Sequence, residues 1–190
     1  MPQVIRDIFE KELKDYFDVE DVIVVNSGTS ALIATLLSLD LDSNSEIITS
    51  PFTFIATGNS ILFGNSNPVF VDIKEDSKLI DEDLIESKIN ENTKAILPVH
   101  LYGRVCNMPK IQELADKYNL IVIEDAAQAF GAMCDFNCEN SEICKPCNKG
   151  TKKAGTFGDA GCFSFYKTKN FSTFEGGMIT INKESKLDAE

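Results

Sequence analysis

The sequence predicts an α/β fold, a three-layer α/β/α sandwich around a mostly parallel sheet of seven strands. Short runs rich in Val and Ile alternate with segments of helical periodicity along most of the chain. Because these runs are apolar at successive positions, the strands are expected to be buried on both faces, which is typical of a parallel sheet covered by helices on each side. At 190 residues the chain is long enough for one such domain with a sizeable core.

The elements can be assigned in chain order. The opening segment, residues 1–17, predicts an amphipathic helix because Ile5, Phe9, Leu13 and Phe17 recur four apart and form one apolar stripe. Seven apolar runs are expected as strands, at residues 21–25, 46–51, 67–73, 94–102, 120–127, 160–166 and 176–182. Helical patterns fill the intervals at residues 31–39, 53–64, 81–89 and 108–119, with Asp81 as the expected N-cap of the third.

Composition excludes some classes of partner. The formal net charge of −12 argues against non-specific binding to nucleic acids or to anionic membranes, since no basic stripe could offset it. No apolar run reaches the length of a membrane span, and the first 17 residues are amphipathic rather than signal-like. We therefore expect a cytoplasmic domain with no nucleic-acid or membrane partner, which must hold any phosphate by backbone amides and a few chosen side chains.

Polar and aromatic residues collect where the predicted strands end. Ligands of such sheets bind beyond the carboxyl ends of the strands. The residues expected there are those of 27–30, 51–54 and 164–169, together with His100, Asp125 and Gln128. One crevice could gather them all.

Residues 26–30, NSGTS, lie between a strand and a helix start. Gly28 would permit close backbone approach, Thr29 and Ser30 would supply hydroxyls, and the free amides of the helix start would face a phosphate. The alternative is an ordinary N-cap with a turn glycine, and the two interpretations are evenly matched.

Two further features concern buried charge. Glu124 and Asp125 end a buried strand, where a carboxylate is costly unless it is paired; it could serve as a helix cap or as the partner of a cationic ring nitrogen. Lys167 and Lys169 lie two apart in an aromatic run, and a desolvated lysine can act as a nucleophile and then as a proton carrier. The alternative for Lys169 is a solvated edge residue, and strand parity cannot separate it from Lys167, because both would share one face.

A phosphate cradle, a strand-end aspartate and a late lysine, in that order on one sheet, resemble the large domain of the DegT/DnrJ/EryC1/StrS family, the pyridoxal-phosphate-dependent sugar aminotransferases of fold type I. The matching stretches include NSGTSAL, SPFTFIATGNSI, VIEDAAQAFGA, GTFGDAGCFSFYKTKN and TFEGGMI, and they cover the chain from about Val22 to Asn182 in the family's order.

The resemblance assigns roles to individual residues. Gly28, Thr29 and Ser30 fall on phosphate-cradle positions, and Ser164 on a second phosphate ligand. Phe54 corresponds to the aromatic that stacks on the cofactor ring, Asp125 to the partner of the pyridinium nitrogen, and Gln128 to a residue near the ring hydroxyl. Lys169 corresponds to the Schiff-base lysine; relatives with histidine there carry out sugar deoxygenation, so Lys169 favours transamination. Lys167 falls where relatives vary. His100 lies in the family's HLYG-type stretch and is expected to be structural.

The implied reaction moves an amino group from glutamate or glutamine to a keto group of a nucleotide-linked sugar, with Lys169 and Asp125 as catalytic residues and a homodimer as the working unit. A dehydratase or lyase of the same fold, or a non-catalytic remnant that binds a partner, pyridoxal phosphate or a nucleotide sugar, is the alternative. The resemblance covers the large domain only: residues 1–190 are expected to be a partial enzyme that lacks the family's small C-terminal domain and has a shortened leading segment.

The six cysteines are unevenly distributed. Four of them, Cys134, Cys138, Cys144 and Cys147, lie in a loop at residues 134–147 that is longer than the hairpin usual in the family. Four thiolates at C-x3-C-x5-C-x2-C spacing suit a tetrahedral zinc ion. A redox-labile loop and two local disulfides are the alternatives.

Overall fold

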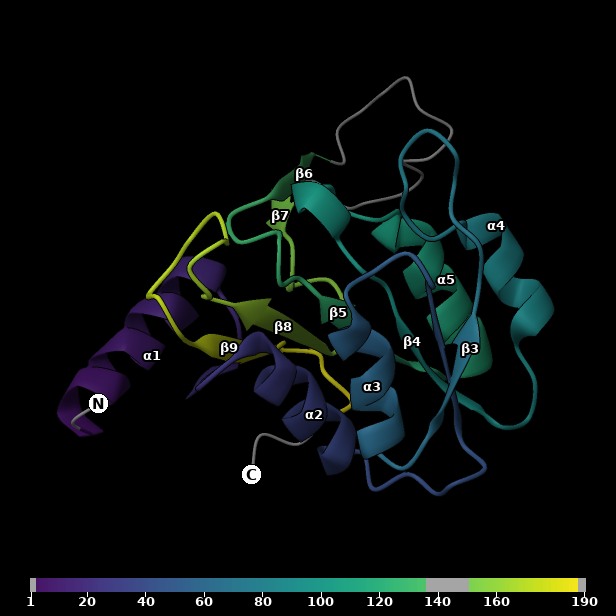
Figure 1. Ribbon diagram of the computed structural model, residues 1–190, viewed down its shortest axis with the longest axis horizontal. Helices are drawn as coiled ribbons and strands as arrows, with labels where there is room; N and C mark the ends of the chain where they lie inside the picture. The colour runs from purple at the N-terminus through teal and green to yellow at the C-terminus, as the bar shows by residue number, and fades with distance from the viewer. Residues whose placement is uncertain (1–2, 136–150, 188–190) are drawn as a thin grey trace.

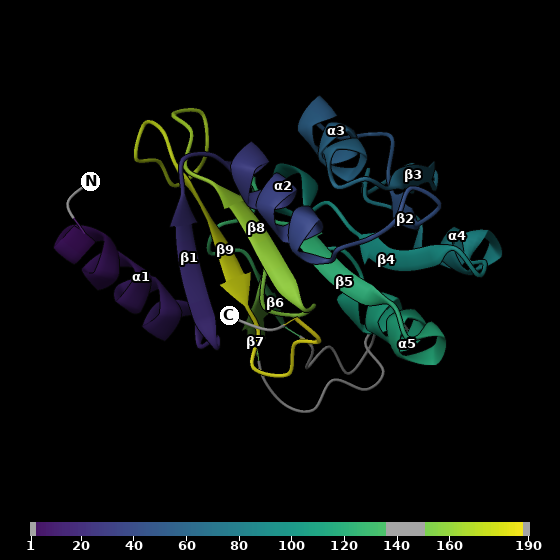
Figure 2. The ribbon, with the colours of Figure 1, turned by 90° about the horizontal axis from the view of Figure 1, so that it is seen from below.

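The computed structural model describes residues 3–135 and 151–187 and confirms the α/β class. Seven strands form one sheet in the order β1-β9-β8-β5-β4-β2-β3 (Figures 1 and 2). β9 runs antiparallel to both of its neighbours, β1 and β8, and the other neighbouring pairs are parallel. Within the described ranges no helix is long and apolar enough to cross a membrane.

The helices and strands occur in the predicted order along the chain. The strands of the sheet are β1 (Asp21–Val25), β2 (Glu46–Thr49), β3 (Asn67–Phe70), β4 (Thr93–Leu97), β5 (Ile121–Asp125), β8 (Ala160–Ser164) and β9 (Gly177–Ile181). The helices are α1 (Gln3–Phe17), α2 (Gly28–Ser38), α3 (Ile55–Phe63), α4 (Glu82–Ile85) and α5 (Met108–Tyr118), with two short 3-10 turns at Glu86–Lys88 and Leu101–Gly103.

Several predicted elements are longer than the observed ones. The fourth strand ends at Leu97, where Pro98 follows and cannot donate to a ladder. The helix predicted at 81–89 is one α-turn that tightens into a 3-10 turn, and Asp81 caps it as predicted, accepting from the Asp83 amide at 3.1 Å. β6 (Met133–Asp135) and β7 (Thr151–Lys153), where the sequence predicts a loop, pair antiparallel, and Cys134 lies on β6.

Helices cover both faces of the sheet. Phe163 on β8 packs against Phe17 of α1, with ring centroids 5.1 Å apart. The neighbouring Cys162 points the other way, and its sulfur lies 3.5 Å from the Thr35 hydroxyl of α2. Figure 1 shows α2 and α3 on one side of the sheet and α5 on the other. The sheet is therefore the middle of three layers, and its strand ends are left open to a ligand.

Candidate active site

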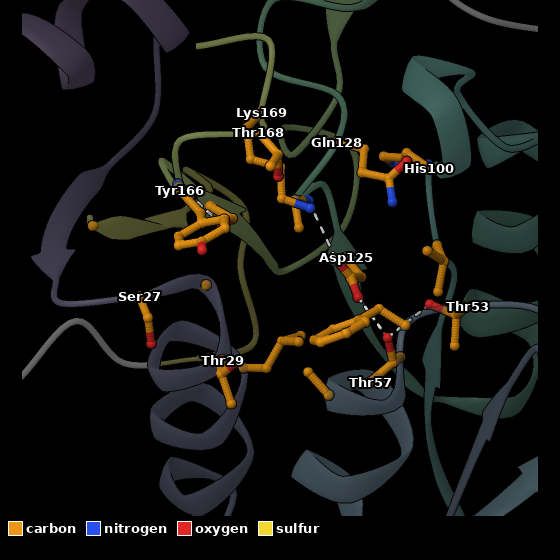
Figure 3. Close-up of a pocket in the computed structure, with 18 of the residues that line it drawn as sticks. Ser27, Thr29, Thr53, Thr57, His100, Asp125, Gln128, Tyr166, Thr168 and Lys169 are labelled. Atoms are coloured by element: carbon orange, nitrogen blue, oxygen red, sulfur yellow. Dashed lines mark hydrogen bonds between the residues drawn. The ribbon is translucent and has the colours of Figure 1, made fainter. Parts of the chain in front are cut away.

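A cavity of about 410 Å³ opens at the carboxyl ends of the central strands (Figure 3). It is lined by all but one of the predicted cofactor residues: Gly28, Thr29, Phe54, Asp125, Gln128, Ser164 and Lys169. These residues lie up to 141 positions apart in sequence, from Gly28 to Lys169 (169 − 28 = 141). The topology of the sheet therefore brings the predicted constellation into one place.

The start of α2 forms one wall. Ser27 is the N-cap, and its hydroxyl accepts from the Ser30 amide at 3.0 Å. The amides of Gly28 and Thr29 have no acceptor within the helix, whose first hydrogen bond runs from the Ala31 amide to the Ser27 carbonyl, so a bound anion can use them. A Cβ atom built on Gly28 would lie 2.7 Å from the Ser164 Cβ atom, so only glycine lets the helix start approach the end of β8 this closely.

Ser30 is the exception among the predicted residues. Its hydroxyl lies 2.9 Å from the Ser27 hydroxyl, and it does not line the cavity. The structure therefore separates it from Gly28 and Thr29, and its assignment to the phosphate remains a prediction. Tyr166 lies on the Ser164 side of the cavity, and its amide donates to the Ser164 hydroxyl at 3.4 Å.

Asp125 is the last residue of β5 and is 5% exposed. Its carboxylate accepts from the Thr57 hydroxyl at 2.8 Å and from the Ala127 amide at 3.2 Å. Burial raises the pKa of the Asp125 carboxyl, and these two hydrogen bonds and the charge of Lys169 offset part of that rise. A cationic ligand at this carboxylate would remove the cost of its burial.

The adjacent Glu124 has a different role, because its carboxylate faces away from the cavity and accepts four hydrogen bonds. Its two oxygens accept from the amides of Gly155, Phe157 and Gly158 at 2.7–2.8 Å and from the His100 Nε2 at 2.7 Å. The His100 Nδ1 accepts from the Cys106 amide at 3.2 Å, which places a ring proton on Nε2, where it donates to Glu124. Since both side chains are fully buried and paired, the expectation that His100 is structural agrees with this geometry.

Gln128 and Phe54 lie at the mouth of the cavity. The Gln128 side-chain oxygen accepts from the Tyr102 amide at 2.9 Å, which leaves the NH2 group as the donor that Gln128 can offer to a ligand. Phe54 is 68% exposed although it is a large apolar side chain. Its ring is therefore available to cover a flat ligand.

The structure distinguishes Lys167 from Lys169, which the alternation of side chains along a predicted strand could not do. β8 ends at Ser164, and the Lys169 amide closes a turn on the Tyr166 carbonyl at 2.8 Å, so the strand does not continue through them. Lys169 is half-buried and lines the cavity. Lys167 is exposed, is absent from the cavity lining, and has its amine 5.8 Å from the centre of the Tyr166 ring.

Sequence reasoning missed Thr57. This threonine is fully buried on α3 and touches Asp125, and the Thr53 hydroxyl lies 2.9 Å from the Thr57 hydroxyl (Figure 3). The one signal in the sequence is their spacing of four at the start of a predicted helix, which places them on the same face.

The proposed zinc site falls mostly outside the described residues. Cys138, Cys144 and Cys147 are not described, and Cys134 lies on β6. Among the residues that are described, no three His, Cys, Asp or Glu side chains are grouped as metal ligands. Zinc therefore stays a prediction, and a metal assay on protein purified without added metal tests it.

Comparison with known proteins agrees with this geometry. The model of the DegT/DnrJ/EryC1/StrS aminotransferase family matches residues 5–189. A GDP-perosamine synthase of Caulobacter vibrioides is 40% identical over 176 residues, which are 93% of this chain and 43% of that enzyme.

Solved structures show the same fold. An aminotransferase from Psychrobacter cryohalolentis superposes with a TM-score of 0.82 at 36% identity, over 94% of this chain and 42% of the other. NtdA from Bacillus subtilis, solved with the cofactor PMP bound, gives a TM-score of 0.79 at 36% identity, over 94% and 37%. The chain thus spans less than half the length of each of these three proteins. By sequence and by fold, it belongs to the DegT/DnrJ/EryC1/StrS aminotransferase family.

Proposed function

We propose that the chain is the cofactor-binding part of a pyridoxal-phosphate-dependent sugar aminotransferase. It would move an amino group from glutamate or glutamine to a keto group of a nucleotide-linked sugar. The observation that carries this proposal is the cavity in which Lys169, Asp125 and the start of α2 meet. The relative named for GDP-perosamine supports a nucleotide-linked sugar as the acceptor.

The residues present fit the phosphate end of that cofactor. A phosphate requires several hydrogen-bond donors in a protein whose net charge is −12. The amides of Gly28 and Thr29 and the hydroxyls of Thr29 and Ser164 supply them from two elements, held together by the close approach at Gly28.

They also fit the ring. Asp125 is a buried carboxylate that accepts only two hydrogen bonds from the described residues, so it has capacity for a protonated ring nitrogen. Phe54 would cover one face of the ring, and the Gln128 NH2 group would donate to the ring hydroxyl.

Bound pyridoxal phosphate supplies the electron sink for the reaction. Lys169 would hold the cofactor through its amine and would then be the group that moves a proton during the transfer. Asp125 would keep the ring nitrogen protonated. The wall formed by α3 and the turn at Tyr166–Lys169 keeps these groups at one cavity.

The partner proposed is a second copy of the chain. Ile55, Leu62 and Phe63 share one face of α3, and each is more than half exposed. This face begins next to Phe54 at the mouth of the cavity. We expect light scattering to show a dimer for the wild-type chain and a monomer for Phe63→Glu; a wild-type monomer would contradict the proposal.

The amino-donor half of the reaction tests the function without knowledge of the sugar. Protein loaded with pyridoxal phosphate is mixed with glutamate, and pyridoxamine phosphate is quantified after denaturation. We expect its formation with wild-type protein and with Lys167→Ala, and none with Lys169→Ala. Wild-type protein that binds the cofactor but forms no pyridoxamine phosphate from glutamate or glutamine would favour a non-catalytic remnant. A keto-sugar nucleotide added next distinguishes transfer from elimination by the product.

A further inference from the structure

Two threonines connect the buried aspartate to the wall of the cavity. The Thr57 hydroxyl lies 2.8 Å from the Asp125 Oδ2 atom, and the Thr53 hydroxyl lies 2.9 Å from that of Thr57. All three residues line the cavity, and Figure 3 shows the chain of hydrogen bonds between them. Thr57 is fully buried, whereas Thr53 is half-buried.

The direction of this chain depends on the charge of Asp125. A hydroxyl has one hydrogen, and an ionised carboxylate only accepts. With Asp125 ionised, Thr57 must donate to Asp125, and Thr53 must then donate to Thr57. A proton on Oδ2 would reverse both bonds. The orientation of the two hydroxyls and the charge of Asp125 are therefore coupled.

Thr57 is one of few groups that favour the charged carboxylate. The titratable groups that face Asp125 are Lys169 across the cavity, Cys162 on β8, and the buried pair of His100 and Glu124. Glu124 and His100 are hydrogen-bonded to each other rather than to the Asp125 carboxylate, and Cys162 is a buried thiol. The Ala127 amide, at 3.2 Å, is the longer of the two hydrogen bonds to Asp125. Of the two hydrogen bonds that stabilise the negative charge of Asp125 within the described residues, the one from Thr57 is therefore the shorter.

We propose that Thr57, supported by Thr53, is a positioning residue that keeps Asp125 ionised and oriented for the ring nitrogen of the cofactor. The inference rests on the proposed function, because it concerns the same cavity. A hydrogen bond to a charged group contributes enough to change an equilibrium by about tenfold to a hundredfold. Loss of the Thr57 hydroxyl should therefore weaken recognition of the ring nitrogen by about tenfold or more.

The test compares two cofactors rather than activity. Dissociation constants are measured by absorbance titration for pyridoxal phosphate and for its analogue with carbon in place of the ring nitrogen. The quantity of interest is the ratio of the two constants, since contacts with the phosphate and the aldehyde cancel. The variants are Thr57→Val, which removes the hydroxyl at constant shape, and Thr57→Ser, which keeps it. Thr49→Val is the matched control, because Thr49 is equally buried and donates at 2.8 Å to the Leu97 carbonyl, on a strand separate from α3.

We expect wild-type protein, Thr57→Ser and Thr49→Val to prefer pyridoxal phosphate, and Thr57→Val to lose about tenfold or more of that preference. An unchanged ratio in Thr57→Val would overturn the inference and leave the proposed function standing. Wild-type protein that fails to bind pyridoxal phosphate would overturn both. Should Thr57→Val not fold, as judged by its thermal melt, Thr53→Val tests the same chain at a half-buried position: a reduced ratio supports the inference, and an unchanged ratio overturns it.

Discussion

Replacing Gly28 by alanine tests how the cavity is built. The added Cβ would lie 2.7 Å from the Ser164 Cβ atom, 3.2 Å from its Cα atom and 3.3 Å from the Phe163 carbonyl oxygen. Carbon atoms in contact are usually about 3.5–4.0 Å apart, so the start of α2 and the end of β8 must separate by about 1 Å. Overpacking of this kind costs about 1–3 kcal/mol of unfolding free energy.

The same movement separates the proposed phosphate donors on α2 and β8. Loss of one charge-assisted hydrogen bond amounts to about 1.5–3 kcal/mol, which weakens pyridoxal phosphate binding by about tenfold or more. Urea unfolding measures the first effect, and absorbance titration with the cofactor measures the second.

Gly58→Ala is the matched control within α3. The nearest atom to its added Cβ is the Phe70 Cζ at 3.9 Å, an ordinary contact, so the substitution should gain about 0.5–1 kcal/mol from helix propensity. Its cofactor affinity should equal that of the wild type. If Gly28→Ala unfolds and binds cofactor as Gly58→Ala does, the close approach of α2 and β8 at Gly28 does not build the phosphate site.

Three further predictions concern buried ionisable groups. Because burial raises the pKa of Asp125 above the ordinary 3.8, the contribution of Asp125 to stability falls as pH rises from about 4. In cofactor-free urea unfolding, Asp125→Asn should therefore gain stability relative to wild type between pH 4 and 7, although it should bind pyridoxal phosphate more weakly. A stability difference that does not change with pH would contradict this. Glu124→Gln places an amide nitrogen against groups that donate, and should cost about 3–5 kcal/mol. Glu113→Gln, at an exposed position of α5, should cost little, and equal melting temperatures of the two variants would disprove the network. Burial and the charges of Asp125 and Glu124 raise the pKa of Cys162 to about 12, although a hydrogen bond with Thr35 lowers it in part. Iodoacetamide at pH 8 should therefore alkylate Cys162 only after unfolding, which peptide mass mapping would show.

The architecture was predictable because its signals are local and repeated. Apolar strands alternating with amphipathic helices predict the layers. The order of the strands in the sheet was not predicted, because β9 lies antiparallel between β1 and β8. Strand ends were less predictable. The run at 160–166 reads as one strand, yet the chain leaves the sheet after Ser164 and turns at Tyr166–Lys169. That turn depends on contacts with the loop before β9, which no local pattern reports.

The site was predictable in its residues and not in its contacts. Asp125 was found because a carboxylate at the end of a buried strand requires a partner. Its partner Thr57 lies 68 positions away and has a residue type that is unremarkable in a helix, so the pairing appears only once the sheet is assembled. Ser30 is the opposite case, because its hydroxyl makes a local hydrogen bond with Ser27, and its assignment to the phosphate stays a prediction.

The central claim is that Lys169, and not Lys167, is the amine that holds the cofactor. Protein incubated with pyridoxal phosphate is reduced with borohydride, digested, and its peptides are mapped by mass spectrometry. We expect a pyridoxyl group on Lys169, with none on Lys167, and loss of labelling at this segment in Lys169→Ala. Labelling of Lys167, or labelling spread over surface lysines without preference for Lys169, would contradict it.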